Sequence, residues 1–503
     1  MRLQLINAPA LLTHGIEGVK RQELGETMSP PLGILYLASF VRRELPYAQI
    51  KITDGLLEGS IKTKHIIDDF DPDVVGISMT TASSTGGYQL SRQIKSKSPR
   101  TLVILGGIHP TSVISDALTK SNADLVAVGE GEKILVEVLK SFAAMNNFRR
   151  LSADVFAGIK GIAWLYRGKV RQTPLMPLIP DLDSIPYPAR DLLDISRYHG
   201  WVVGKNRPET TILSTRGCPF NCHFCSNRVW KLQLPYLRLR SPKKVMDEVE
   251  MLIKDYSIRE YFDNADEINS ALPWVTAYCQ EKIRRKLTTP WKAMLRADKM
   301  TKDLAKLLKK SNCWYVHLGI ESGNQRTIDG VGKYITLEQV ISCCRLLKKE
   351  GITICGLFMF FNAWEKNGRL EFETVKDSLN TLTFVKHLFS EGLIDYMTWS
   401  QTTPYPGSKL FDTALKHRLI PRRYLRHWQY FNHSWSFVMK LPGISDRERL
   451  MVKTRGAVLQ TLYLIKKGHL PLDTFPYLLT RGISLLKRII WTILPWRGAY
   501  FYR

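Results

Sequence analysis

Three cysteines, Cys218, Cys222 and Cys225, stand at CxxxCxxC spacing directly after the apolar run 211–217. We interpret that run as a strand, which puts the cysteines on a loop at its carboxyl end. Three thiolates on so short a loop can converge on one [4Fe–4S] cluster, and they leave one iron open to a substrate or cosubstrate. A closed zinc site normally has four ligands, and His223 lies too close in the chain to two of the cysteines to serve well as the fourth. Three unrelated thiols are the remaining alternative.

Residues 1–150 alternate short apolar runs with helical periodicity. Strands are predicted at 3–6, 49–53, 74–78, 102–105 and 125–128, and helices at 32–43 and 87–97. Such alternation implies right-handed crossovers and a Rossmann-like, doubly wound parallel sheet, with its ligand at the carboxyl ends of the strands. We therefore expect ligand loops at 7–33, 80–86, 106–109 and 129–132.

A second alternation of strand and helix begins near residue 209. Strands are predicted at 211–217 and 260–262, and further strands with the turns that end them within 291–298, 316–323, 352–361 and 398–408. Ser241 followed by Pro242 predicts a helix start. Six strands imply an incomplete α/β barrel, a partial (β/α)6 barrel, with its chemistry at the carboxyl ends. The expected domains are thus 1–150, a proline-rich linker at 151–205, the barrel at 206–420, and a basic, aromatic, helical region at 421–503.

The cysteine loop, with Gly217 before it and Pro219 within it, resembles the signature of radical S-adenosylmethionine (SAM) enzymes. The stretches 30–33, 72–78, 106–110 and 124–132 resemble, in the same order, the cobalamin-binding domain that one subgroup of these enzymes carries. The resemblance implies that the open iron chelates SAM and that an electron, from an external flavodoxin- or ferredoxin-type donor, cleaves SAM to a 5'-deoxyadenosyl radical. Substrate would lie between SAM and cobalt.

The resemblance also implies ligands for each of three cofactors, a 4Fe-4S cluster, SAM and cobalamin. The cluster would be held by the three loop cysteines. SAM would be bound by Phe224, Asp263, Arg296, Glu321, Ser322 and Glu365. Cobalamin would be bound by Pro31, Gly33, Ser78, Thr80, Gly106, Gly107, His109, Gly129, Glu130 and Gly131. No catalytic residue is assigned.

Two stretches depart from the pattern of the family. The DxHxxG loop, whose histidine ligates cobalt in many cobalamin proteins, is absent; the similar stretch 54–59 follows the second strand and has Leu56 at the ligand position. We therefore expect a displaced lower base and no histidine beneath cobalt, with His109 or His14 nearby only by chance. The fifth strand lacks the Gly-x-Pro-Gly-Glu turn and keeps only Glu365, so the adenine wall is expected to differ. A Rossmann-like domain that binds nothing is the alternative.

The formal net charge is +26, and residues 416–503 carry 17 Lys and Arg against 3 Asp and Glu. Such a charge favours an anionic partner. The segment 427–433 is expected to pack over the barrel mouth. The segment 478–494, apolar but broken by three basic residues, suits either an interfacial helix on anionic lipid or a helix docked on the barrel. No secretory signal or spanning apolar run is evident, so we expect a cytoplasmic protein, either free or peripheral on the inner face of the membrane.

These observations and the resemblance together favour one function. The resemblance implies a cobalamin-dependent radical SAM methyltransferase that methylates an unactivated carbon of a small or lipid-like substrate. The same architecture also serves cyclisation, oxidation and carbon–carbon coupling, and the fold does not decide among them. An RNA-binding or RNA-modifying protein is an alternative of another class, which the absence of a recognisable RNA module disfavours.

Overall fold

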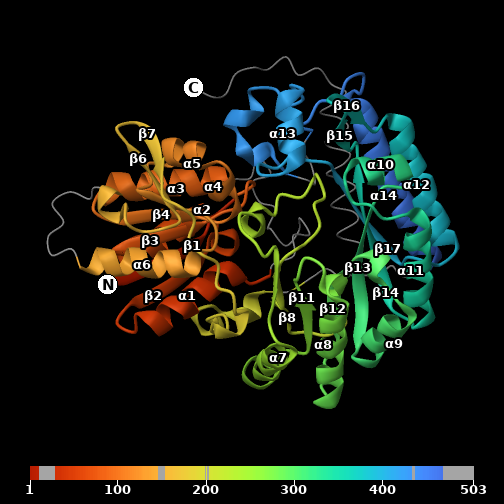
Figure 1. Ribbon diagram of the computed structural model, residues 1–503, viewed down its shortest axis with the longest axis horizontal. Helices are drawn as coiled ribbons and strands as arrows, with labels where there is room; N and C mark the ends of the chain where they lie inside the picture. Colours follow the sequence, from red (N-terminus) through yellow and green to blue (C-terminus); the bar gives the residue numbers. More distant parts are fainter. Residues whose placement is uncertain (11–28, 145–152, 199, 201–202, 433–436, 468–503) are drawn as a thin grey trace.

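The structure is a computed structural model, and it describes residues 1–10, 29–144, 153–198, 200, 203–432 and 437–467. Within these residues, two largely parallel sheets lie next to each other, and each has helices packed against it (Figure 1). The predicted α/β class, with a Rossmann-like unit followed by a partial barrel, is confirmed.

The first sheet has the strand order β2-β1-β3-β4-β5-β6-β7. Its parallel part, order 2-1-3-4-5, is a doubly wound arrangement whose ligand crevice lies between β1 and β3. The strands are β1 (Arg2–Asn7), β2 (Gln49–Asp54), β3 (Val74–Ser78), β4 (Leu102–Gly106) and β5 (Leu125–Ala127). The helices are α1 (Leu32–Glu44), α2 (Gly55–Phe70), α3 (Ser84–Lys97), α4 (Ile108–Ser112), α5 (Ile114–Ser121) and α6 (Gly131–Ala143).

Both faces of this sheet are buried because successive side chains of each strand point to opposite sides. Along β4, Leu102 and Ile104 pack into one core with α1 and α6, whereas Val103 and Leu105 pack into the other with α2, α3 and α5. Burial on both sides explains why these strands read in the sequence as continuous apolar runs.

The expected linker at 151–205 is wrong in part, because it contributes two strands to this sheet. β6 (Ile162–Tyr166) pairs antiparallel with β5, and β7 (Lys169–Gln172) pairs antiparallel with β6. The prolines that follow interrupt regular structure only after residue 173. The added strands cover the edge that β5 would otherwise expose.

The second sheet is the partial barrel, with the strand order β17-β14-β13-β12-β11-β8 and only parallel pairings. Its strands are β8 (Glu209–Ile212), β11 (Glu260–Asp263), β12 (Trp291–Leu295), β13 (Cys313–Glu321), β14 (Thr353–Phe360) and β17 (Tyr396–Gln401). Its helices are α7 (Pro242–Tyr256), α8 (Leu272–Arg284), α9 (Lys302–Lys310), α10 (Gln325–Gly330), α11 (Leu337–Lys349), α12 (Val375–Ser390) and α13 (Lys409–Lys416).

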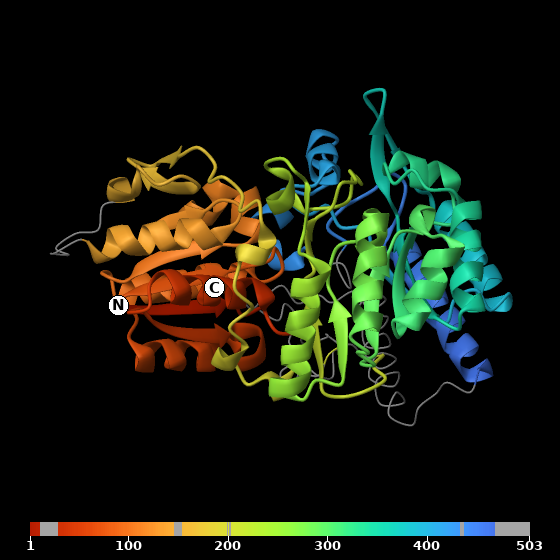
Figure 2. The ribbon, with the colours of Figure 1, turned by 60° about the horizontal axis from the view of Figure 1, so that its bottom comes forward.

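Two short ribbons interrupt the barrel pattern. The run 211–217, expected as one strand, is split: β8 ends at Ile212, and β9 (Thr215–Gly217) pairs antiparallel with β10 (Leu237–Leu239). After β14, where the family turn was missing, β15 (Ala363–Lys366) and β16 (Arg369–Phe372) form a hairpin that projects from the barrel (Figure 2).

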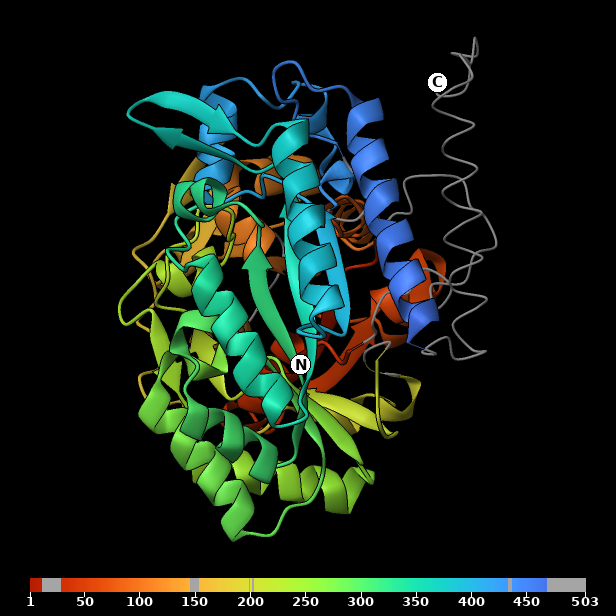
Figure 3. The same cartoon turned by 90° about the vertical axis from the view of Figure 1, so that its right-hand side faces the viewer.

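The segment that follows α13 joins the two units. Trp428 is buried, donates its indole N–H to Asp116 of α5 at 2.5 Å, and lies 5.1 Å from His109 between ring centroids. It therefore contacts the first unit as well as the barrel, rather than simply covering a barrel mouth. The last described helix, α14 (Asp446–Lys466), runs beside α12 on the outside of the barrel (Figure 3).

The basic segment 478–494 lies outside the described residues. Among the described helices, none is long and apolar enough to cross a bilayer.

Candidate functional site

The cysteine loop leaves β9 at a position that only glycine can occupy. Gly217 has φ +90°, and a Cβ there would lie 2.1 Å from the carbonyl oxygen of Tyr236. Farther along, the backbone N–H of His223 donates to Val331 O at 2.8 Å, and its carbonyl accepts from Leu410 N at 2.8 Å. The loop is thus fixed against the segment after β13 and against the start of α13.

The three loop thiols are partly exposed and free of disulfide bonds. Burial raises the pKa of all three, that of Cys218 to about 12, and nearby Glu267 adds to the effect on Cys218 and Cys222. A thiol must lose its proton to ligate iron, so cluster binding would release protons. The donor set fits a cluster held by three thiolates. In the described part of the chain, no three metal-ligating side chains are arranged to hold a single ion.

Charged side chains surround this loop at the carboxyl ends of β12 and β13. Lys333 is buried and donates to Glu321 Oε1 at 2.7 Å. The Arg296 guanidinium lies over the Phe220 ring, 3.8 Å from its centroid, and its Nε donates to Asp298 at 2.6 Å. Its Nη1 is buried without a partner among the described residues. Arg296 and Glu321 therefore lie beside the cysteine loop, and their assignment to SAM stays a prediction.

Glu267 is a functional candidate that the sequence reasoning missed. Burial raises the pKa of this carboxyl to about 7, against the opposing charges of Lys333 and Arg296. Its Oε2 is buried and has no hydrogen-bond partner among the described residues. Glu267 thus has a buried oxygen beside the cluster loop that is able to accept a hydrogen bond from a cationic group. An ammonium group such as that of SAM would suit it.

Asp263, which the resemblance assigned to the SAM ammonium, has one oxygen engaged by the backbone, while its Oδ2 is buried without a partner among the described residues. Its assignment to SAM stays a prediction. Its Oδ1 accepts from the backbone N–H groups of Ser214 and Ala265 at 3.3 and 3.2 Å, so it fixes the turn that follows β11. Burial raises its pKa to about 6. Two later acids, Asp266 and Glu267, lie close enough to the loop for their charges to raise the pKa of Cys218. In the sequence, only the position of Asp266 and Glu267 shortly after a predicted strand could have indicated that they lie near the cysteine loop.

Two further expected SAM contacts have other partners. Ser322 is fully buried and donates to Glu373 Oε1 at 2.7 Å, so its hydroxyl holds the strand ends together. Glu365 lies on β15 and accepts from Lys416 and His417, each at 2.8 Å. These partners account for both side chains within the protein, and the assignment of each to SAM stays a prediction. Phe224 packs partly buried against the barrel core, and its role stays a prediction.

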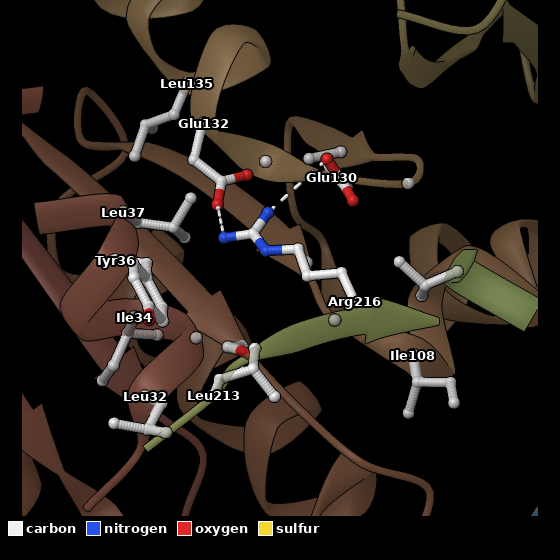
Figure 4. Close-up of a pocket in the computed structure, with 18 of the residues that line it drawn as sticks. Leu32, Ile34, Tyr36, Leu37, Ile108, Glu130, Glu132, Leu135, Leu213 and Arg216 are labelled. Carbon is white, nitrogen blue, oxygen red and sulfur yellow. Dashed lines mark hydrogen bonds and ion pairs between the residues drawn. The ribbon is translucent and has the colours of Figure 1, made fainter. Parts of the chain in front are cut away.

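A cavity of about 450 Å³ opens between the carboxyl edge of the first sheet and the barrel (Figure 4). Its lining includes seven of the ten residues expected to bind cobalamin: Gly33, Ser78, Gly106, Gly107, Gly129, Glu130 and Gly131. Its deep part is apolar, lined by Leu5, Ile104, Ile134 and Val138.

Glycines make this cavity a suitable cradle for a large, flat ligand. Gly107 has φ +93°, which L side chains rarely adopt. A Cβ on Gly106 would meet no protein atom within 4 Å, so backbone is exposed there to whatever fills the cavity. Open backbone above an apolar interior fits cobalamin with its lower base displaced, and the described lining contains no histidine.

His109, Pro31 and Thr80 do not line the cavity. His109 is fully buried, and its two ring nitrogens lie 3.2 Å from Thr81 Oγ1 and 2.9 Å from Tyr88 Oη. Burial lowers its pKa to about 3, so the imidazole is neutral. With both nitrogens engaged, His109 has none to offer a ligand, and its assignment to cobalamin binding is wrong.

Four buried charged residues connect the two units, and three of them, Glu130, Glu132 and Arg216, line this cavity. We call them the inter-domain clamp: Glu130, Glu132, Arg216 and Arg238. Arg216 Nη2 lies 2.5 Å from Glu132 Oε1, Arg216 Nη1 lies 3.5 Å from Glu130 Oε2, and Arg238 pairs with Glu130. Their side chains are at most 7% exposed. Because Arg216 is two residues before Cys218, the clamp ties the cluster loop to the first unit (Figure 4).

Comparisons with known proteins agree with this two-unit organisation. Residues 26–139 match the B12 binding domain family, and residues 212–366 match the Radical SAM superfamily. An uncharacterized methyltransferase, PH0819, of Pyrococcus horikoshii is 34% identical over 404 residues, which cover 78% of this chain and 80% of the relative. An anaerobic magnesium-protoporphyrin IX monomethyl ester cyclase of Rubrivivax gelatinosus is 30% identical, covering 76% of this chain and 66% of the relative.

A solved structure shows the same fold. The radical S-adenosylmethionine methyltransferase TsrM of Kitasatospora setae, with cobalamin and a [4Fe-4S] cluster bound, superposes with a TM-score of 0.62 at 15% identity. The match covers 83% of this chain and 78% of that one.

Proposed function

Because the chain belongs to the radical SAM proteins that carry a B12-binding domain, we propose that it is a cobalamin-dependent methyltransferase acting on an unactivated carbon of a small organic substrate. The observation that carries the proposal is the shared cavity. The same space is lined by the glycine loops of the first unit, by Arg216 and Gly217 just before the cysteines, and by Asp266 after β11. A substrate there would meet both cofactors.

Each group of residues has a task in this proposal. When bound, SAM on its cluster supplies a 5'-deoxyadenosyl radical, and cobalamin supplies a methyl group. The three cysteines would hold the cluster, Glu267 would accept from the SAM ammonium, and Arg296 Nη1 would donate to its carboxylate. The clamp would hold the two units together along the cavity, so that the loops of both units keep their positions around the substrate.

A cyclase is the second candidate, and a specific observation favours it. The relative from Rubrivivax gelatinosus carries that name and is 30% identical over 390 residues. The two reactions differ in whether a methyl group reaches the product, so products separate them.

The test is anaerobic reconstitution of the full chain with iron, sulfide and hydroxocobalamin, followed by SAM, a reductant and candidate substrates. Formation of both 5'-deoxyadenosine and S-adenosylhomocysteine supports methyl transfer, whereas deoxyadenosine alone with a turned-over substrate supports the cyclase. Cys222→Ser should lose the cluster absorbance and both products. Cys343→Ser, at a buried position outside the loop, is the matched control and should retain them. A protein that binds one zinc and forms neither product would refute the proposal.

The substrate and partners can be specified further. We infer a lipid-like or otherwise amphiphilic substrate, an external flavodoxin- or ferredoxin-type electron donor, and peripheral contact with anionic membranes. The support is the charge of residues 416–503 and the apolar, basic pattern of 478–494. Flotation with vesicles of anionic and of neutral lipid tests the membrane contact. Protein that stays entirely in solution with both kinds would contradict it.

A further inference from the structure

Arg449, in the first turns of α14, is a buried cation that forms no ion pair with any residue the structure describes. The residue is 2% exposed, and its Nε and Nη2 are buried with no hydrogen-bond partner among the described residues. Burial lowers the pKa of its guanidinium to about 10. Its described neighbours are aromatic: its Cζ lies 5.3 Å from the Phe361 ring centroid and 5.8 Å from that of Phe437.

Asp446 is the one acid in the described part of the chain whose charge raises the pKa of Arg449. Its Oδ2 accepts from Lys440 at 2.5 Å, and its Oδ1 is buried without a hydrogen-bond partner among the described residues. Among the described residues Arg449 forms no ion pair within 4 Å. A buried cation left unpaired is costly, and folding alone would favour an apolar side chain at this position.

Arg449 lies at the edge of the barrel where chemistry takes place. The far end of α14 is beside the start of β17, because Gln460 accepts from Met397 N at 2.9 Å and Tyr463 donates to Ile394 O at 3.2 Å. The first turns of α14 therefore lie at the carboxyl end of β17. Phe361, under the guanidinium, directly follows β14 at the same edge.

A second unsatisfied donor and a strained residue mark the same edge. Gln401, the last residue of β17, pairs in register with Phe360, and its Nε2 is buried without a partner among the described residues. Phe361 has φ +61°, a conformation that costs an aromatic residue energy and that clusters at functional sites.

We propose that Arg449 binds an oxyanion of the substrate, a carboxylate or a phosphate-type group, and so places the substrate at the carboxyl edge of β14 and β17. The planar guanidinium matches either group with two parallel N–H···O bonds. This proposal depends on the proposed function in one respect: it assumes that the oxyanion belongs to the substrate of the enzyme. If so, the substrate is an organic anion.

The test compares Arg449→Met with the matched control Arg447→Met, which removes the same charge from an exposed position two residues away. Thermal unfolding of the full chain is followed at constant ionic strength, first in chloride alone and then with inorganic phosphate or acetate. In chloride, Arg449→Met should unfold at an unchanged Tm or at one higher by about 2–8 °C, because methionine fills the space between the rings without a buried charge.

Phosphate or acetate should raise the Tm of the unmodified protein and of Arg447→Met, with an apparent Kd at least tenfold weaker in Arg449→Met. A response to one anion but not the other identifies the oxyanion class. A lower Tm or no folded protein for Arg449→Met, which would indicate a structural cation, overturns the proposal. So does an anion response that is absent from the unmodified protein or retained in Arg449→Met. This test measures anion binding and not SAM cleavage. A failed reconstitution assay therefore does not affect its result, and a failed anion test does not affect the result of the reconstitution assay.

Discussion

Removal of Arg216 should destabilise the protein far more than removal of an exposed arginine. In Arg216→Met, Glu130 keeps Arg238, but Glu132 is left 5% exposed with no described cation beside it. Breaking a buried pair by deleting one partner costs about 3–5 kcal/mol. If Glu132→Leu is added, the orphaned charge disappears, and the double variant should cost only about 1–2 kcal/mol.

The free energy of unfolding is measured by urea titration of the full chain, with tryptophan fluorescence as the signal. The unmodified protein, the two single variants and the double variant form a double-mutant cycle. Because a two-unit protein can unfold in steps, the first transition is the one compared. Arg42→Met is the control: its pair with Asp191 at 2.9 Å is 45% and 56% exposed, and its loss should cost less than about 1 kcal/mol.

The reasoning is refuted if Arg216→Met costs no more than Arg42→Met, or if the effects of Arg216→Met and Glu132→Leu simply add. Either result would mean that the clamp is as well solvated as a surface pair and does not tie the cluster loop to the first unit.

Three further predictions follow from buried groups. Asp263→Asn should be more stable than the unmodified protein at pH 7.5, by at most roughly 3 kcal/mol, and the gain should nearly vanish at pH 4. Burial raises the pKa of Asp263 from 3.8 to about 6, so the unmodified protein loses stability as the pH rises from 3.8 to about 6 and stays at the lower stability above that. Urea midpoints at the two pH values measure this, and an equal gain at both would contradict it. His109→Leu should cost about 1–3 kcal/mol, because Tyr88 and Thr81 lose a buried partner, yet bound cobalamin should keep its absorption spectrum; an altered spectrum would restore His109 as a ligand. Trp428→Ala should lower the unfolding free energy by about 3–5 kcal/mol, and a loss below 1 kcal/mol would mean that the 424–431 segment does not join the units.

Much of the fold could be predicted because it is encoded locally. The expected strand at 74–78 coincides with β3, and the helix start at Ser241 and Pro242 is the N-terminus of α7. The prediction of a linker at 151–205 was wrong in part because the many prolines after residue 173 suggested irregular structure for the whole stretch, although the short strands β6 and β7 precede them. The prediction of a single strand at 211–217 was wrong because this one apolar stretch contributes strands to two different sheets.

The candidate site was predicted less completely, and the errors share a cause. The glycines of the cavity and the three cysteines could be predicted because each belongs to a motif of only a few consecutive residues. His109 was misassigned, and the partners of Asp263, Ser322 and Glu365 were not foreseen, because the partner of a side chain depends on its direction after the strand ends, which neighbours distant in the chain decide.

The sequence by itself determined the order of the elements, the position of the cysteine loop and the glycine-lined strand ends, since each depends on periodicity or spacing within a few residues. Only the tertiary structure decided that Glu132 meets Arg216 across 84 residues, that Glu267 lies close enough to raise the pKa of Cys218, and that Arg449 is buried with no ion pair among the described residues. These features depend on burial and on distances between remote segments, which exist only once the two sheets have packed together.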